Sequence, residues 1–155
     1  MFHRANPSLF GRPDSVVRGS RALRSTASEL REACASSSEG EPQAFLRTFR
    51  LLSDFSRQLS SYFDATTSAN HFDAISEDCP SLASRARDVE WGHEELRASF
   101  AVTTTPGPGL ATMCTLGFSR HVADLLDRFE EHEHSERRLL QDFFLRTGET
   151  ECSAT

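Results

Sequence analysis

The C-terminal third of the chain contains a stretch, FEEHEHSERRLLQDFF, in which histidine and glutamate are concentrated before the sequence becomes apolar. Its apolar residues recur at steps of three and four, which predicts an amphipathic helix. Successive helical residues are rotated by about 100°, so His132 and Glu136 fall on the apolar side, whereas Glu131 and His134 fall opposite and Glu133 lies at the edge. We therefore expect most of these charged groups to face solvent, and His132 and Glu136 to point inward.

A third polar group occupies the same kind of position in the segment EWGHEELRASF. His93 lies between Val89 and Leu96 in a run that also follows the helical period. Two imidazoles and one carboxylate that converge in a helical core are suitable ligands for iron, zinc, copper or manganese. His132 and Glu136 are four residues apart, which places them one turn apart on one face. The sequence thus offers three candidate metal ligands.

The same residues also allow a core without metal. A buried carboxylate is costly unless it is neutralised or paired, but the partner need not be a metal ion. His93 or His132 could pair with Glu136, or Arg97, one turn after His93, could neutralise it. The residue pattern alone leaves both interpretations open.

A ferritin-like di-iron centre is a further possibility that the spacing disfavours. Such bundles use Glu-x-x-His on two helices and one glutamate from each of the other two. The chain contains this spacing at Glu90–His93 and at Glu131–His134. The second pair cannot face inward together with the apolar residues of its helix, and the first two predicted helices offer no inward glutamate.

Four amphipathic segments are predicted to be helices, and their boundaries carry proline, glycine or capping signals. They cover residues 14–34, 42–66, 80–100 and 118–143, and Gly148 is the predicted end of the last helix. A continuation of the second helix to Ile75, with a bend at residues 68–70, also fits the pattern, and residues 103–116 are expected to form a loop. This organisation predicts an all-α protein, an antiparallel up-and-down four-helix bundle over residues 14–146, with tails at 1–13 and 147–155.

Composition narrows the functional classes. The net charge is −6, which argues against general affinity for nucleic acid. The N-terminus has no apolar secretory signal, and no run is long enough to span a membrane. The four cysteines form no Cys-x-x-Cys pair and are expected to be free thiols in a cytoplasmic protein. Most of the 12 phenylalanines are expected in the core.

These residues resemble the bacterial hemerythrin-like, or HHE cation-binding, domains from about residue 20 to residue 146. HEHSERRLLQDFF is similar to the final helix of that family, EWGHEELRASF to its third helix, and CPSLASRA to the lead-in before that helix. The resemblance implies an up-and-down four-helix bundle with a non-haem iron site that binds oxygen or acts in sensing and iron handling. Carried over to this chain, it implies that His93, His132 and Glu136 are metal ligands.

The first two helices depart from the family pattern. Tyr62 and Thr66 stand where the family usually has histidine and glutamate, and no histidine occurs around residues 20–26. The resemblance therefore implies a reduced site that holds a single ion and serves to bind or sense a small diatomic ligand or to handle metal. The alternative is a metal-free bundle that acts as a protein-interaction or regulatory module. No nucleophile–base pair is visible, so an enzyme is not expected.

Overall fold

Every regular element in the described chain is a helix, which confirms the predicted all-α class. The computed structural model describes residues 14–36, 41–105 and 117–152. The elements are α1 (Asp14–Ser36), α2 (Pro42–Ser68), α3 (His71–Asp78), the short 3₁₀ helix η2 (Pro80–Leu82), α4 (Ala83–Thr104) and α6 (Phe118–Cys152). The predicted tail 1–13 and most of the predicted loop, residues 106–116, lie outside the described residues.

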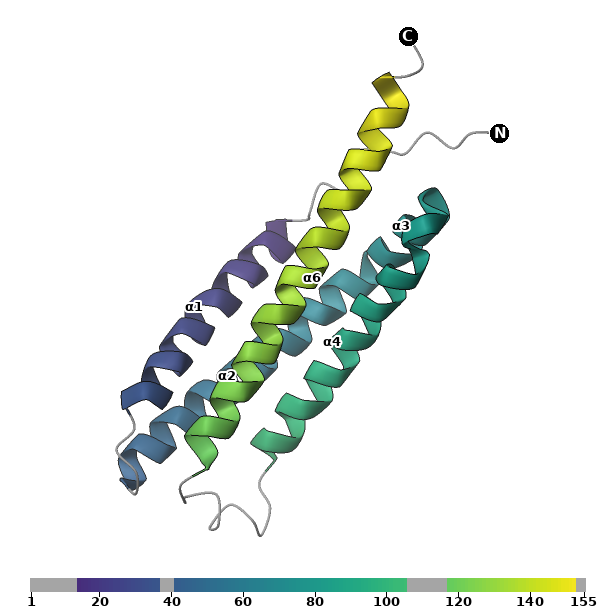
Figure 1. Cartoon of the computed structure of the whole chain (residues 1–155). Coiled ribbons are helices and arrows are strands. Elements are labelled where there is room, and N and C mark those ends of the chain that lie inside the picture. The colour runs from purple at the N-terminus through teal and green to yellow at the C-terminus, as the bar shows by residue number, and fades with distance from the viewer. Residues whose placement is uncertain (1–13, 37–40, 106–116, 153–155) are drawn as a thin grey trace.

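The long helices α1, α2, α4 and α6 lie side by side (Figure 1). Helix α1 packs against α2 and α6, and α4 packs against the same two helices. Successive long helices reverse direction, so that α1 and α4 run opposite to α2 and α6 (Figure 1). Side chains from antiparallel α4 and α6 can therefore meet midway along their length.

The second predicted helix is broken rather than bent. Helix α2 ends at Ser68, and Asn70 adopts a left-handed conformation with φ of 52° before α3 begins at His71. Asparagine tolerates this conformation better than most residues, because its short polar side chain can bond locally. The result is a separate helix, α3, whose Phe72 and Ile75 are buried.

The predicted end of the last helix at Gly148 was wrong. Helix α6 continues through Gly148 to Cys152, so residues 147–152 of the predicted tail are helical. Glycine ends a helix when it takes the left-handed conformation that other residues avoid, and Gly148 does not take it. A helical glycine costs only about 1 kcal/mol relative to alanine, which a long helix tolerates.

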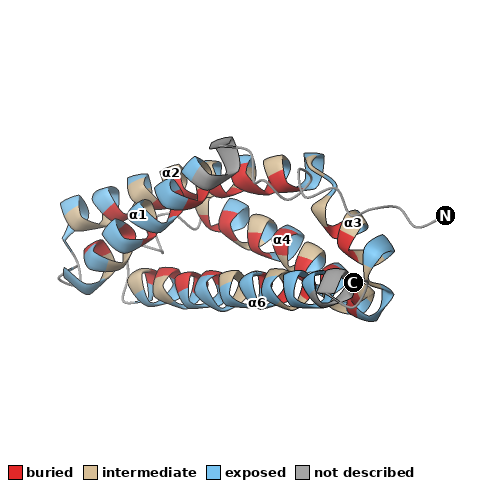
Figure 2. Cartoon of the chain, turned by 90° about the horizontal axis from the view of Figure 1, so that it is seen from above, coloured by how far each residue is buried: buried red, intermediate tan, exposed pale blue. Residues whose placement is uncertain are grey.

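Buried residues line the sides of the helices that face one another (Figure 2). One apolar cluster joins all four long helices and contains Phe55, Phe100 and Phe129, whereas a second joins α3, η2, α4 and α6 around Ile75 and Phe143. Seven phenylalanines of the described chain are buried, as expected of this residue type: Phe55, Phe63, Phe72, Phe100, Phe118, Phe129 and Phe143. Phe144, by contrast, is 51% exposed.

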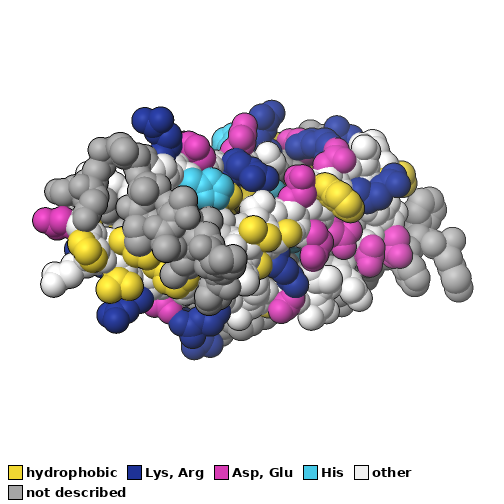
Figure 3. Space-filling model, turned by 90° about the horizontal axis from the view of Figure 1, so that it is seen from below, with side chains coloured by type: hydrophobic (Ala, Val, Ile, Leu, Met, Phe, Trp, Pro, Cys, Tyr) yellow, Lys and Arg dark blue, Asp and Glu magenta, His cyan; other side chains and the backbone are white. Residues whose placement is uncertain are grey.

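Acidic and basic side chains are interspersed on the face drawn in Figure 3. Ion pairs also join neighbouring helices, such as Arg31 of α1 with Asp127 and Glu130 of α6, at 2.9 and 2.8 Å. Arg85 of α4 also pairs with Asp142 of α6. Exposed pairs of this kind contribute little stability individually, so the apolar clusters dominate the packing. Within the described segments, no helix is both apolar enough and long enough to cross a lipid bilayer.

Candidate metal centre

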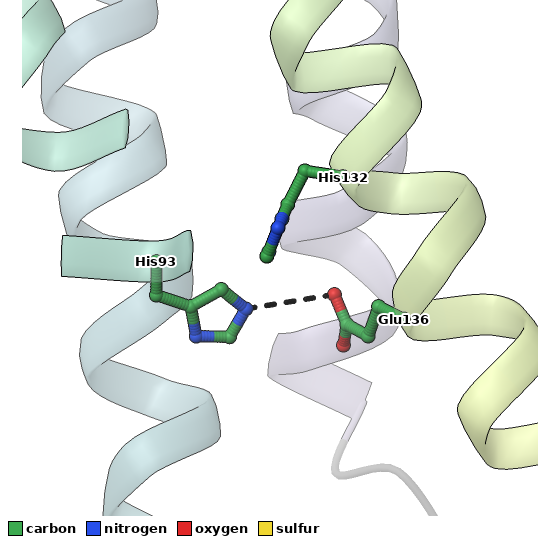
Figure 4. A group of neighbouring side chains, drawn as sticks. All are labelled: His93, His132 and Glu136. Carbon is green, nitrogen blue, oxygen red and sulfur yellow. Dashed lines mark ion pairs between the residues drawn. The ribbon is translucent and has the colours of Figure 1, made fainter. Parts of the chain in front are cut away.

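The three predicted ligands converge between α4 and α6 (Figure 4). His93 projects from α4, and His132 and Glu136 project from α6. One potential ligand atom from each residue lies within 4.8 Å of the others. The spatial convergence expected from the helical phase is therefore observed, whereas the binding of a metal stays a prediction.

The histidine- and glutamate-rich stretch divides between core and solvent as predicted. Glu136 is 7% exposed and His132 is half-buried, whereas Glu131 and His134 are exposed. Glu133 is half-buried at the edge, and its Oε1 accepts a hydrogen bond from Arg24 Nε of α1 at 3.1 Å. The four-residue spacing thus places one imidazole and one carboxylate on the inner side of α6.

His93 is held between aromatic rings and is only 1% exposed. Its ring stacks on Phe63 of α2, with centroids 4.0 Å apart and an interplanar angle of 17°, and the Phe72 ring lies edge-on at 5.3 Å. Neither imidazole nitrogen has a hydrogen-bond partner among the described residues. The nearest carboxylate atom is Glu136 Oε2, 3.7 Å from Nε2, which is too long for a hydrogen bond. His93 is therefore fixed by packing, with its nitrogens free to accept another partner.

Glu136 spans the gap between α2 and α4. The hydroxyl of Tyr62 in α2 donates a hydrogen bond to Glu136 Oε1 at 3.4 Å, while Oε2 faces His93. The sequence comparison indicated Tyr62 as the residue that replaces a histidine of the family pattern, and the structure places it beside Glu136. The suggestion that Arg97 neutralises Glu136 was wrong, because Arg97 Nη2 lies 2.8 Å from Asp64 Oδ1 on the surface of α2.

The His132 side chain is poised to act as a neutral ligand. Its pKa is lowered from 6.5 to about 4, mainly by burial and also by the nearby His93, while Glu136 opposes the shift. Its ring lies edge-on to the His93 ring, with centroids 4.9 Å apart. The Nε2 atom is buried, and no described residue hydrogen-bonds to it. Because metals bind the neutral imidazole, the shifted pKa favours coordination at neutral pH.

The described residues of helices α1 and α2 add no histidine, cysteine or carboxylate to this group of three. Ser20 of α1 is buried, and its Oγ accepts a hydrogen bond from Arg24 Nη2 at 3.2 Å. Thr66 of α2 is buried as well, and its hydroxyl donates to the Phe63 carbonyl at 2.9 Å. Both hydroxyls therefore serve local hydrogen bonds, as expected if these positions do not supply ligands.

A pocket between α1 and α6 borders the Glu136 side of the centre. It has a volume of about 300 Å³, and its lining includes Ser20, Arg24, Tyr62, Glu133, Glu136 and Arg137. Glu136 and Tyr62 therefore border space that a small molecule or water can enter. A second, smaller pocket of about 200 Å³ borders His132 from the groove between α4 and α6.

Comparisons of this chain with models of protein families, with curated proteins and with solved structures found no match. The function must therefore be argued from the geometry of the site. Two imidazoles and a carboxylate suit first-row transition metals, whereas Mg²⁺ and Ca²⁺ prefer oxygen ligands alone.

Proposed function

We propose that the chain is a hemerythrin-like, up-and-down four-helix bundle. Support comes from the four long helices, each of which packs against two others and reverses direction relative to the one before it. It also comes from the resemblance of the segments around His93 and His132, whose side chains meet in the core. The extra helix α3 then forms part of the connection from the second to the third helix of the bundle.

Within this bundle we propose a single-ion, non-haem metal site formed by His93, His132 and Glu136. The observation that supports the proposal most is a group of buried nitrogen atoms without hydrogen-bond partners among the described residues. Four buried side-chain nitrogens have no hydrogen-bond partner among the described residues, and three of them belong to His93 and His132. An unpaired buried polar group costs about 1–3 kcal/mol. A cation between the two imidazoles and the carboxylate would bind one nitrogen of each histidine and offset the buried negative charge.

The ligand set favours iron or a similar divalent ion as the occupant. Three protein ligands leave coordination positions open, and such an ion supplies them to a small exogenous ligand. The pocket beside Glu136 and Tyr62 offers a route to that side of the centre. The role that fits is the binding or sensing of a small diatomic ligand, or the handling of metal, rather than catalytic turnover. A second ion is not expected, because Thr66 brings no bridging carboxylate.

A metal-free module for protein interaction is the second candidate. It is favoured by the hydrogen bond from Tyr62, which gives Glu136 a partner without any ion. It is also favoured by large apolar side chains on the surface, such as Trp91 of α4, which is 70% exposed, and Leu145 of α6, which is 65% exposed. In this case the fold would be retained for its surface, and the three polar residues would form a neutral core network.

Metal analysis of purified protein tests the proposed site. The full chain is expressed with added iron, manganese and zinc, and is compared with His132→Ala and with His134→Ala. The control removes the same residue type from the same helix, because His134 is exposed and points away from the centre. We expect about one ion per chain in the wild type and in His134→Ala, and a loss of most of it in His132→Ala. Equal metal content in all three proteins would overturn the proposal.

A further inference from the structure

Gly92 occupies a position where the helix itself gives no reason for glycine. It lies in the interior of α4, directly before His93, and its backbone is not left-handed. Glycine in a helix interior destabilises the helix relative to alanine. A close approach by another group is the usual compensation for this loss.

The group that approaches Gly92 is the His132 ring. A Cβ atom added at Gly92 would lie 2.6 Å from both Cε1 and Nδ1 of His132, and the next nearest atom, at 3.8 Å, belongs to the same ring. Gly148 of α6 is different, since an added Cβ there meets nothing within 4 Å. The missing side chain of Gly92 thus forms a notch in α4 that receives one edge of an imidazole from α6.

We infer that Gly92 is a positioning residue of the metal centre, which holds the His132 imidazole where it can share an ion with His93 and Glu136. This inference rests on the proposed function. The same turn of α4 would then supply one ligand, His93, and the notch that fixes the other histidine. An alanine at this position would force the ring from 2.6 Å to about 3.4 Å, the start of ordinary contact. Metal–ligand distances tolerate only about 0.2 Å, so the displaced ring would not meet the ion in the same geometry.

The first test compares Gly92→Ala with Gly148→Ala by titrating the metal-free protein with Zn²⁺ and, without oxygen, with Fe²⁺. Both variants add one methyl group to a helix and keep all three ligands. We expect Gly92→Ala to bind at least about 10-fold more weakly, the size of effect seen when a group that orients a ligand is lost. Gly148→Ala is expected to bind like the wild type. If the wild type binds metal and Gly92→Ala binds it with the same affinity, the inference about Gly92 is overturned, but the proposed metal site is not.

The second test detects the contact without any metal. Thermal unfolding of the metal-free protein is measured for Gly92→Ala, for His132→Ala and for the double variant. Once the His132 ring is removed, the added methyl has room, so the helix propensity of alanine should raise the melting temperature by about 2–4 °C. With His132 present, the clash should cancel or reverse that gain. The same shift in both backgrounds would show that Gly92 does not act through His132.

The two tests separate the inference from the proposed function. A wild type that binds neither ion in the titration overturns both the metal site and the role of Gly92 in it. A metal-binding wild type whose Gly92→Ala variant binds weakly, together with a shift that depends on His132, supports both. Because the second test uses stability alone, a Gly92→Ala variant that folds poorly still gives a decisive result through the double variant.

Discussion

At the scale of the residue, each of the three proposed ligands is held by a different kind of contact. His93 is stacked on Phe63, Glu136 accepts a hydrogen bond from Tyr62, and His132 rests in the notch at Gly92. None of these contacts ties up both nitrogens of an imidazole. The two imidazoles are thus oriented by packing, while both nitrogens of His93 and Nε2 of His132 have no hydrogen-bond partner among the described residues, which is the arrangement that a preorganised metal site requires.

The depressed pKa of His132 predicts how the stability of the metal-free protein depends on pH. The pKa is about 4 in the folded chain, against 6.5 for the exposed imidazole of the unfolded chain. Between these pH values His132 is protonated in the unfolded state but neutral in the folded state. The free energy of unfolding therefore falls as the pH is lowered from about 6.5 to 4. His132→Ala removes this contribution, and its denaturant unfolding should decline less steeply over the same range.

Denaturant titrations at several pH values, with a chelator present, measure this difference. His134→Ala serves as the control, because His134 is exposed and should leave the pH dependence unchanged. Parallel stability curves for wild type and His132→Ala would contradict the burial of a neutral imidazole at this position.

At the scale of the element, the helical period predicted the inner faces of α4 and α6 well. Burial along a helix depends mainly on angle, so a run of apolar residues fixes which polar residues lie among them. The buried positions of Val89 and Leu96 predicted that His93 lies in the core. Those of Leu125 and Leu139 predicted the inner face of α6 in the same way. The period does not state which residue lies opposite on the neighbouring helix. For that reason neither the notch at Gly92 nor the hydrogen bond from Tyr62 could be predicted.

Helix ends were less predictable than helix faces, since they depend on single residues. The break between α2 and α3 rests on the left-handed backbone of Asn70. The sequence also predicted a helix end at Gly148, but this residue lies within α6, which continues to Cys152. A residue that permits a break does not impose one, and the sequence alone does not tell the two cases apart.

Substitutions of Asn70 test its role in this break. Asn70→Ala should lower the free energy of unfolding by about 1 kcal/mol, because alanine resists the left-handed conformation more than asparagine does. Asn70→Gly should be neutral or slightly stabilising, since glycine adopts it without strain. Urea unfolding measures both variants. An alanine variant as stable as the glycine variant would mean that this backbone conformation is not needed between α2 and α3.

At the scale of the whole molecule, the polar centre interrupts the apolar core. Along α4, His93 lies between Leu96, which belongs to the larger apolar cluster around Phe55, and Val89, which belongs to the smaller cluster around Ile75. Along α6, His132 and Glu136 lie between Phe129 of the larger cluster and Leu139 of the smaller one. The candidate site is thus a polar layer between two apolar clusters, at a depth where the chain could instead have buried more hydrophobic surface.

Glu136→Met distinguishes a functional polar layer from a structural one. If the carboxylate is present to bind metal, the hydrogen bond from Tyr62 offsets only part of its desolvation in the metal-free protein. An apolar side chain of similar size should then leave the free energy of unfolding unchanged or raise it by up to about 2 kcal/mol, and metal binding should be lost. If the hydrogen bond from Tyr62 makes Glu136 a structural group, the same change should destabilise the protein by about 1–3 kcal/mol.

Glu131→Met on the exposed side of α6 is the matched control, and its free energy of unfolding should stay within about 0.5 kcal/mol of the wild type. Urea unfolding with a chelator present, followed by metal titration of the same samples, therefore decides between the metal site and the metal-free core.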